Sequence, residues 1–310
     1  MRAREPDLTG RVDCDGVEIY YEVFGDGDLT ILLLPTWFII HSRFWKLQVP
    51  YLARHFRVIT YDSPGNGKSD RPLDPKAHGV YPHLRYTEAV LDQVGVDSAV
   101  LVGLSQGGQF AVSFAAEHPG RVDGLAMIGA AVPVLLTGPS ERGEYIMENF
   151  EQPYPSRPPS EVRIGGRDDP RDWAKYNRQY WRDDLEDFAW FFFGQCFPEP
   201  YSTKQSEDCV GWSMETTGEL LGAEWDARVG DIKTYRDWAA RIRCPLLLIH
   251  GTEDTIVPIA VSEELARITG AQLVAFQGAG HIPLAREPVK VNLLLRDFVD
   301  RVAEGAAVAR

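Results

Sequence analysis

Short hydrophobic runs alternate with longer amphipathic stretches over the first 130 residues of the chain and again after about residue 243. A solid apolar run such as residues 30–34 is typical of a central strand that is covered on both faces. Runs of this kind predict strands at 17–23, 30–34, 57–61, 98–104, 122–128, 244–250 and 272–276. Amphipathic stretches predict helices near 44–54, 84–94, 107–118, 259–268 and 288–303. This alternation predicts an α/β fold, with a mostly parallel, doubly wound sheet that has helices on both faces.

The interval from residue 134 to residue 242 departs from the alternation. Prolines between 153 and 159 break regular structure there, and helix-like segments follow near 172–182 and 184–193. Six of the eight tryptophans lie in this interval: Trp173, Trp181, Trp190, Trp212, Trp225 and Trp238. We therefore expect a helical cap over 134–242, inserted between the sixth and seventh strands of a core made of 1–133 and 243–310. Its aromatic side chains are expected to fill the cap's own core and, as a group, to form part of an apolar pocket wall.

Composition narrows the classes of function. The 310 residues are 44% hydrophobic and 25% charged, which is ordinary globular usage and excludes wholesale disorder. The net charge of −13 disfavours binding to phosphate backbones and to anionic lipid surfaces. The longest apolar stretch, residues 31–40, is half of the roughly 20 residues that a membrane-spanning helix needs. We expect no signal peptide, no membrane or nucleic-acid partner, and a cytoplasmic location; self-association stays open.

Four cysteines are scattered along the chain without a C-x-x-C pair: Cys14, Cys196, Cys209 and Cys244. In a cytoplasmic protein this pattern indicates reduced thiols, not a disulfide framework or a zinc site. Metal-ligating residue types do not cluster at ligand spacing anywhere in the sequence. We therefore expect neither a metal nor a cofactor.

A glycine-flanked serine follows the predicted strand at 98–104, in the segment GLSQG of residues 103–107. G-x-S-x-G at a strand-to-helix turn forms a nucleophile elbow, in which small flanking residues permit a tight turn that exposes the hydroxyl of Ser105. The N–H groups at the start of the following helix then point toward an oxyanion. A glycine-rich turn with an incidental serine is the alternative, and the preceding strand and Gly108 disfavour it.

A serine hydroxyl needs a neighbouring base, and the base needs an orienting acid, to attack a carbonyl near neutral pH. Asp254 lies in the loop after the predicted strand at 244–250, and His281 lies in the loop after the strand at 272–276. Glu253 is the weaker candidate for the acid because its side chain is expected to point away. His250 ends a buried strand and is expected to be structural. The chain order of serine, acid and histidine is the one that α/β-hydrolases use.

Nearly the full length of the chain resembles the α/β-hydrolase fold superfamily with a lid insertion. Besides the elbow, the segments HGTED at 250–254 and GH at 280–281 carry the resemblance, and YDSPGNGKSD at 61–70 is similar to the turn after the family's fourth strand. The resemblance implies that Ser105 is the nucleophile, His281 the general base and Asp254 the residue that orients it. Some members place the acid after the sixth strand, where this chain has GAAV at 129–132 and no carboxylate.

The loop after the predicted strand at 30–34 departs from the family pattern. Where the family usually carries His-Gly, this chain has LPTWF at 34–38. By position, the backbone N–H groups of Trp37 and Gln106 are expected to form the oxyanion hole. The side chain of Trp37 is expected to crowd the acyl pocket.

The leading hypothesis is a serine hydrolase that cleaves a small apolar ester, lactone or related acyl substrate through an acyl-enzyme on Ser105. Carbon–carbon bond hydrolysis by the same triad is the nearest chemical alternative. A ligand receptor that keeps the hydrolase fold with little turnover is an alternative of another class, and the altered loop at 35–37 favours it.

Overall fold

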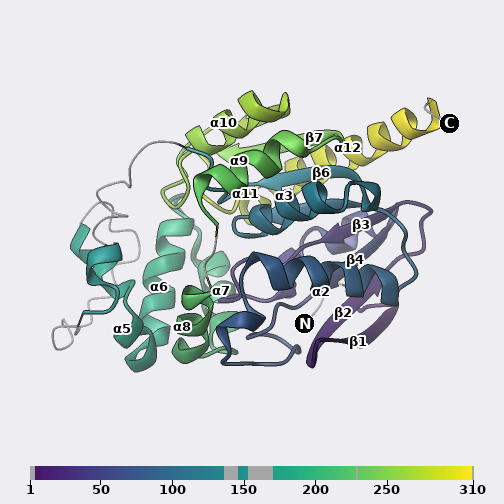
Figure 1. The fold of residues 1–310 in the computed structure, drawn as a ribbon. Helices are drawn as coiled ribbons and strands as arrows, with labels where there is room; N and C mark the ends of the chain where they lie inside the picture. The colour runs from purple at the N-terminus through teal and green to yellow at the C-terminus, as the bar shows by residue number, and fades with distance from the viewer. Residues whose placement is uncertain (1–3, 136–145, 153–169, 228–229, 309–310) are drawn as a thin grey trace.

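The computed structural model describes residues 4–135, 146–152, 170–227 and 230–308, which form an α/β fold around an eight-stranded sheet (Figure 1). The strand order is β1-β2-β4-β3-β5-β6-β7-β8; the β1–β2 and β2–β4 pairs are antiparallel and the other pairs are parallel. The strands are β1 (Leu8–Cys14), β2 (Val17–Phe24), β3 (Thr30–Leu33), β4 (Arg57–Tyr61), β5 (Ala99–Leu104), β6 (Val122–Ile128), β7 (Leu246–Gly251) and β8 (Gln272–Phe276).

The helices fall into two groups along the chain. Those outside the interval between β6 and β7 are η1 (Ser42–Trp45), α1 (Val49–Leu52), η2 (Pro75–Ala77), α2 (Val80–Gln93), α3 (Gly107–Glu117), η3 (Pro119–Arg121), α10 (Ala260–Thr269), α11 (Pro283–Arg286) and α12 (Pro288–Val308). Those between β6 and β7 are η4 (Pro170–Lys175), α5 (Arg178–Asp183), α6 (Leu185–Cys196), α7 (Thr203–Ser213), α8 (Gly218–Asp226) and α9 (Ile232–Arg241).

Successive residues of the central strands serve opposite faces of the sheet, since side chains along a strand alternate in direction. Ile31 and Leu33 pack into a buried cluster with side chains of α1 and α12. Leu32 and Leu34 pack into a second cluster with side chains of α2, α3, α9 and α10. Figure 1 shows α2 and α3 crossing in front of the sheet. The doubly wound architecture predicted from the sequence is therefore confirmed.

The seven predicted strands coincide with β2 to β8 to within two residues at each end. Strand β1 was not predicted from the sequence, because it is a mostly exposed edge strand in which polar residues interrupt the apolar ones. The helix predicted at 44–54 is shorter and divided, because Pro50 lies in the first turn of α1 and cannot continue a hydrogen-bonded helix from η1. The helix predicted at 172–182 is likewise divided, at Asn177, whose side chain caps the start of α5.

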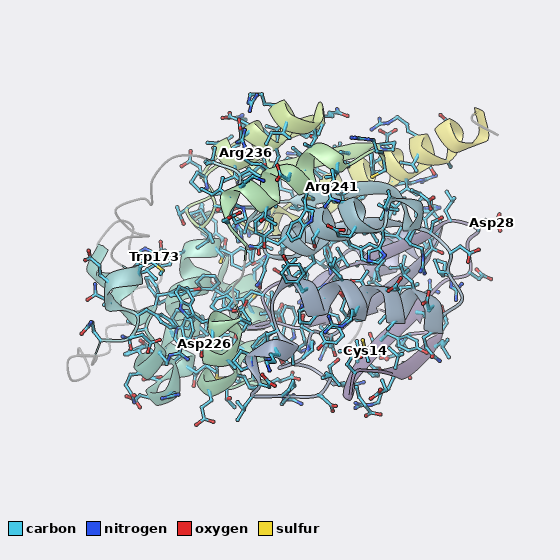
Figure 2. The ribbon with its side chains drawn as sticks, viewed as in Figure 1. Cys14, Asp28, Trp173, Asp226, Arg236 and Arg241 are labelled. Carbon is cyan, nitrogen blue, oxygen red and sulfur yellow. The ribbon has the colours of Figure 1, made fainter. Side chains whose placement is uncertain are left out.

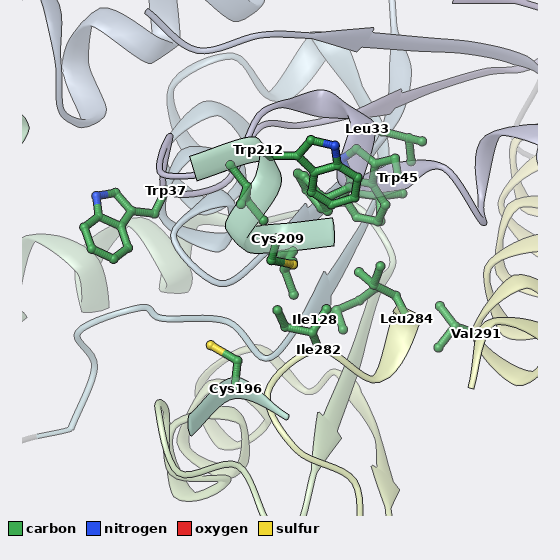
Figure 3. Packing of buried hydrophobic residues seen from close by; sticks show 14 of the residues in the cluster. Leu33, Trp37, Trp45, Ile128, Cys196, Cys209, Trp212, Ile282, Leu284 and Val291 are labelled. Carbon is green, nitrogen blue, oxygen red and sulfur yellow. The ribbon is translucent and has the colours of Figure 1, made fainter. Parts of the chain in front are cut away.

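Helices α5 to α8 lie beside the edge of the sheet formed by the carboxyl ends of its parallel strands (Figure 1). The Asn66 side chain, in the loop after β4, donates to the Trp212 carbonyl of α7 at 3.2 Å. The backbone N–H of His281, after β8, donates to the carbonyl of Cys196 in α6 at 3.0 Å. Figure 3 shows Cys196 and Cys209 on two sides of Ile128, at the end of β6, with Trp212 beyond Cys209. Side chains from these helices thus share one buried hydrophobic cluster with the strands.

The division of the chain into a core of 1–133 and 243–310 and a cap of 134–242 stays a prediction. Helix α9 falls inside the predicted cap but packs against α3, where the Tyr235 hydroxyl donates to the Gln109 side chain at 2.8 Å. Figure 2 shows Arg236 and Arg241 of α9 beside the sheet layer, well apart from Trp173 and Asp226. The prolines at 153–159 lie outside the described residues. Within the described ranges, no helix has both the length and the apolar character needed to cross a membrane.

Candidate active site

Ser105 stands in the tight turn between β5 and α3. Its φ of 53° lies in the left-handed region, where a residue other than glycine carries strain of about 1–3 kcal/mol. The Ser105 N–H donates to the Ile128 carbonyl of the neighbouring strand at 3.0 Å and so anchors the turn. A Cβ at Gly103 would lie 2.5 Å from the Gly107 carbonyl oxygen, and a Cβ at Gly107 would lie 2.5 Å from that of Pro35. Both glycines of the G-x-S-x-G pattern are therefore required by close backbone packing.

The three residues predicted as nucleophile, base and acid lie in one chain of hydrogen bonds. His281 Nε2 lies 2.9 Å from Ser105 Oγ, and His281 Nδ1 lies 2.8 Å from Asp254 Oδ2. A carboxylate accepts, so Nδ1 carries a proton and Nε2 accepts from the serine hydroxyl. The side chains of His281 and Asp254 are 4% and 0% exposed, whereas Glu253 is exposed. The geometry thus favours Asp254 over Glu253 as the partner of the histidine.

The Asp254 carboxylate has three further contacts besides the one to His281. Its Oδ1 accepts the backbone N–H groups of Ile256 and Val257 at 2.8 and 2.9 Å. Its Oδ2 faces the rings of His250 and His281. Burial alone would raise the pKa of Asp254, but attraction to His281 and hydrogen bonds from both histidines and the Val257 N–H outweigh it and hold the pKa well below its usual range. The carboxylate is therefore ionised when the histidine takes up a proton.

His250 plays a part in this arrangement that the sequence analysis did not find. Its Nε2 lies 3.1 Å from Asp254 Oδ2 and 2.9 Å from the Val257 carbonyl, and its Nδ1 lies 2.7 Å from Ser262 Oγ. Since both neighbours of Nε2 are acceptors, Nε2 carries the proton and Nδ1 accepts from the Ser262 hydroxyl. His250 thus contacts the same carboxylate oxygen, Oδ2, as His281 and helps to hold it in place. The spacing of four residues between His250 and Asp254, across a strand end, is the signal that could have indicated this contact.

The two residues predicted to form the oxyanion hole, Trp37 and Gln106, line the same cavity as Ser105. Among the described residues, neither of their backbone N–H groups has a hydrogen-bond acceptor. The indole of Trp37 stacks on Tyr176, with ring centroids 5.8 Å apart, and meets Phe192 edge to face at 5.1 Å. Trp37 therefore forms a wall between the sheet edge and the helices that follow β6.

Among the residues that the structure describes, Ser105 lines two hollows of very different size. The larger has a volume of about 540 Å³, and six aromatic side chains among the described residues line it: Trp37, Trp173, Tyr176, Phe192, Trp225 and Tyr235. The smaller has a volume of about 30 Å³ and is lined by Thr36, Trp37, Ile39, Ile40, Leu104, Ser105, Phe192, Phe193, Cys196, His281 and Ile282. Aromatic side chains from the interval 134–242 therefore lie in the wall of an apolar cavity, as the sequence analysis expected of that group.

Glu224 is a second residue that the sequence analysis missed. It lies on α8, is 2% exposed and lines the larger cavity, where it is the one charged side chain among the described lining residues. Its Oε1 accepts from the Gln106 side chain at 2.5 Å. The contact joins residues that are far apart in the sequence, so no local sequence pattern predicts it. It links the helices between β6 and β7 directly to the elbow.

Within the part of the chain that the structure describes, no three His, Cys, Asp or Glu side chains are grouped to hold a metal ion. The four cysteines are free thiols. Burial raises the pKa of Cys196, and electrostatic interaction with Cys209, Asp254 and Glu199 adds to the effect.

The family comparison decides the assignment of the chain. The family model described as alpha/beta hydrolase fold matches residues 30–288. The chain belongs to the α/β-hydrolase fold family. This α/β-hydrolase is 25% identical over 289 residues to a bifunctional esterase/perhydrolase of Acinetobacter calcoaceticus, with 92% of this chain and 97% of the relative covered. It is 29% identical over 265 residues to a pimeloyl-(acyl-carrier protein) methyl ester esterase of Aromatoleum aromaticum, with 82% and 92% covered.

Solved structures show the same fold. The enol-lactonase of Burkholderia xenovorans superimposes on this α/β-hydrolase with a TM-score of 0.73 at 22% sequence identity, covering 94% of this chain and 100% of the lactonase. Esterases and a lactonase are thus among the proteins that this chain resembles.

Proposed function

We propose that this α/β-hydrolase cleaves carboxylic esters or lactones through a covalent acyl-enzyme on Ser105. The observation that carries the proposal is the continuous hydrogen-bonded path from Ser105 Oγ through His281 to the buried carboxylate of Asp254, with steps of 2.9 and 2.8 Å. Ser105 lies in the wall of a cavity lined by aromatic side chains, which favours an apolar substrate. The esterases among the curated relatives support the class of reaction.

In the first half of the reaction, Ser105 Oγ attacks the carbonyl carbon and its proton passes to His281 Nε2. The carbonyl electron pair moves onto oxygen, and the resulting oxyanion accepts the N–H groups of Trp37 and Gln106. The ionised Asp254 stabilises the imidazolium. As the bond to the leaving oxygen breaks, His281 gives its proton to the departing alkoxide, so that the alcohol leaves and the acyl group stays on Ser105.

In the second half, a water molecule attacks the acyl-enzyme while His281 Nε2 takes its proton. The second tetrahedral intermediate collapses, the carboxylic acid leaves, and the proton returns to Ser105 Oγ. The balance is one ester and one water consumed for one acid and one alcohol. With a lactone, the leaving alkoxide stays attached to the acyl chain, so a single hydroxy acid is released.

The loop at 35–37 favours a second candidate, a receptor that binds an apolar ligand in the aromatic cavity and turns it over slowly or not at all. Pro35 and Thr36 stand where the family usually carries His-Gly, and the next residue, Trp37, lies in the wall of the cavity. Removing a single oxyanion donor can slow an acyl-transfer enzyme by about 100–1000-fold. Tight ligand binding that Ser105→Ala leaves unchanged, with negligible turnover of esters, lactones and vinylogous diketones, would favour the receptor.

Reaction with a fluorophosphonate probe, followed by peptide mass mapping, tests the proposal. The probe is expected to label Ser105 in the wild type, and Ser105→Ala is expected to lower kcat for an activated ester by at least about 1000-fold. Ser113→Ala is the matched control, because the Ser113 hydroxyl is buried in α3 and donates only to a helix carbonyl. Turnover that persists in Ser105→Ala, with an unchanged circular dichroism spectrum, contradicts the proposal, as does labelling of another residue.

A further inference from the structure

The proposed base, His281, lines the small hollow of about 30 Å³ at Ser105 but is not among the described lining residues of the large cavity of about 540 Å³. We propose that this enzyme selects esters of a large acyl group with a small alcohol, with the acyl group in the large cavity and the alcohol in the small hollow. The inference rests on the proposed ester hydrolysis and adds the orientation and the size of the two substrate parts.

The orientation of the ester in the two hollows follows from the proton that His281 must give to the leaving oxygen. The leaving oxygen must lie within about 2.6–3.2 Å of His281 Nε2 to receive its proton, so the alcohol part of the ester occupies space that this histidine faces. The described space of that kind is the small hollow, which Ser105 and His281 line together. The acyl part then extends from the same carbonyl carbon past Trp37 and Gln106, which line the large cavity.

The volume of the small hollow sets the size of the alcohol. A space of about 30 Å³ holds on the order of two water molecules, which corresponds to a methoxy or ethoxy group. Three of its wall side chains, Ile39, Phe193 and Cys196, are each 1% exposed and belong to the main hydrophobic cluster. The Cys196 carbonyl also accepts the His281 N–H at 3.0 Å, which ties this wall to the base. A larger alcohol would therefore have to displace packed core side chains.

The large cavity suits an aromatic or long alkyl acyl group. Its rings come from separate parts of the chain, with Trp173 on η4, Phe192 on α6 and Trp225 on α8, and they enclose the acyl chain from several sides. Once a small alcohol has left, the hollow beside His281 has room for the water that attacks the acyl-enzyme. Both halves of the reaction thus use one proton-transfer position.

A pair of isomeric esters tests the orientation. Methyl phenylacetate and benzyl acetate have the same formula, and each carries the large group on the opposite side of the ester. After division by the rates of alkaline hydrolysis, kcat/KM for methyl phenylacetate is expected to exceed that for benzyl acetate by at least about 10-fold. In the series of methyl, ethyl, propyl and butyl phenylacetates, kcat/KM is expected to fall beyond the ethyl ester.

Variants of the small hollow sharpen the test. Ile39→Ala, or Ile39→Val if the first variant does not fold, is expected to raise kcat/KM for butyl phenylacetate relative to the methyl ester. Ile31→Ala is the matched control, because Ile31 is a buried isoleucine of the same cluster that lines neither hollow, and it is expected to leave the ratio unchanged.

The outcomes separate this inference from the proposed function. If the fluorophosphonate labels Ser105 but methyl phenylacetate is not turned over faster than benzyl acetate, the inference is overturned and the acyl-enzyme stands. If Ser105 is not labelled and neither isomer is hydrolysed, the proposed function fails and the inference falls with it.

Discussion

The loops at the carboxyl edge of the sheet and the helices between β6 and β7 build the site by different means. In the loops, backbone hydrogen bonds hold single atoms in place: the Ser105 N–H is bound to the Ile128 carbonyl, and two N–H groups hold Asp254 Oδ1. In the helices, rings pack on rings, as where Trp181 of α5 lies against Phe188 of α6 with ring centroids 5.2 Å apart. Hydrogen bonds are directional and ring packing is much less so. The loops therefore fix the positions of the atoms that we propose to react, and the helices shape the cavity in which we propose that the substrate binds.

The two regions meet at a few contacts. Glu224 of α8 binds the side chain of Gln106 beside the elbow, and the Cys196 carbonyl of α6 binds the His281 N–H. Through these contacts, the helices that shape the cavity also touch the residues proposed for the chemistry. Substitutions in the loops and in the helices test whether the two regions have these different roles.

The largest effect is expected from the loop side. Asp254→Asn is expected to lower kcat by about 10⁴-fold with little change in KM, because an amide can donate to His281 Nδ1 and favour the wrong tautomer of the ring. Steady-state kinetics with an activated ester measure both constants. Glu253→Gln is the matched control, since Glu253 is adjacent and exposed, and it is expected to keep wild-type kinetics. A greater loss in Glu253→Gln than in Asp254→Asn would show that the acid is misassigned.

A smaller effect is expected where the helices meet the elbow. Glu224→Leu removes the acceptor of the Gln106 side chain, and a hydrogen bond to a charged group is worth about 1.5–3 kcal/mol, so kcat is expected to fall by about 10-fold or more. Glu224→Gln keeps an oxygen acceptor and is expected to restore most of the loss. The rate of fluorophosphonate labelling reports the reactivity of Ser105 separately from substrate binding. Equal kcat values in the leucine and glutamine variants would mean that this contact does not position the elbow.

The smallest effect is expected in the pH dependence of stability. An unfolded aspartate has a pKa near 3.9, and the pKa of Asp254 is lower in the folded protein, so its contribution is present above about pH 4 and is lost as the pH falls toward the folded value. Below about pH 4, the free energy of unfolding of the wild type is expected to fall by about 1.4 kcal/mol per pH unit more steeply than that of Asp254→Asn. Urea unfolding between pH 3 and pH 7 measures this difference. Parallel curves for the two proteins would contradict the low pKa.

Where prediction from the sequence succeeded, the information was local. The strand at 98–104, the glycines of GLSQG and the positive φ of Ser105 belong to one short segment, and its close backbone contacts leave no room for side chains at Gly103 and Gly107. Strand β1 was missed because an exposed edge strand needs no continuous apolar run. The role of His250 was missed because a buried histidine at a strand end looks the same whether or not it contacts a carboxylate.

Patterns only a few residues long were enough to predict the alternation of strands and helices, the turn around Ser105 and the chain order of the candidate acid and base. The folded chain was needed to show that His281 Nε2 contacts Ser105 Oγ, that Glu224 contacts Gln106, and that Ser105 lines both a large and a small hollow. These contacts join residues more than a hundred positions apart, and hollow volumes depend on the packing of many side chains at once. Such packing cannot be predicted from any short stretch of the sequence.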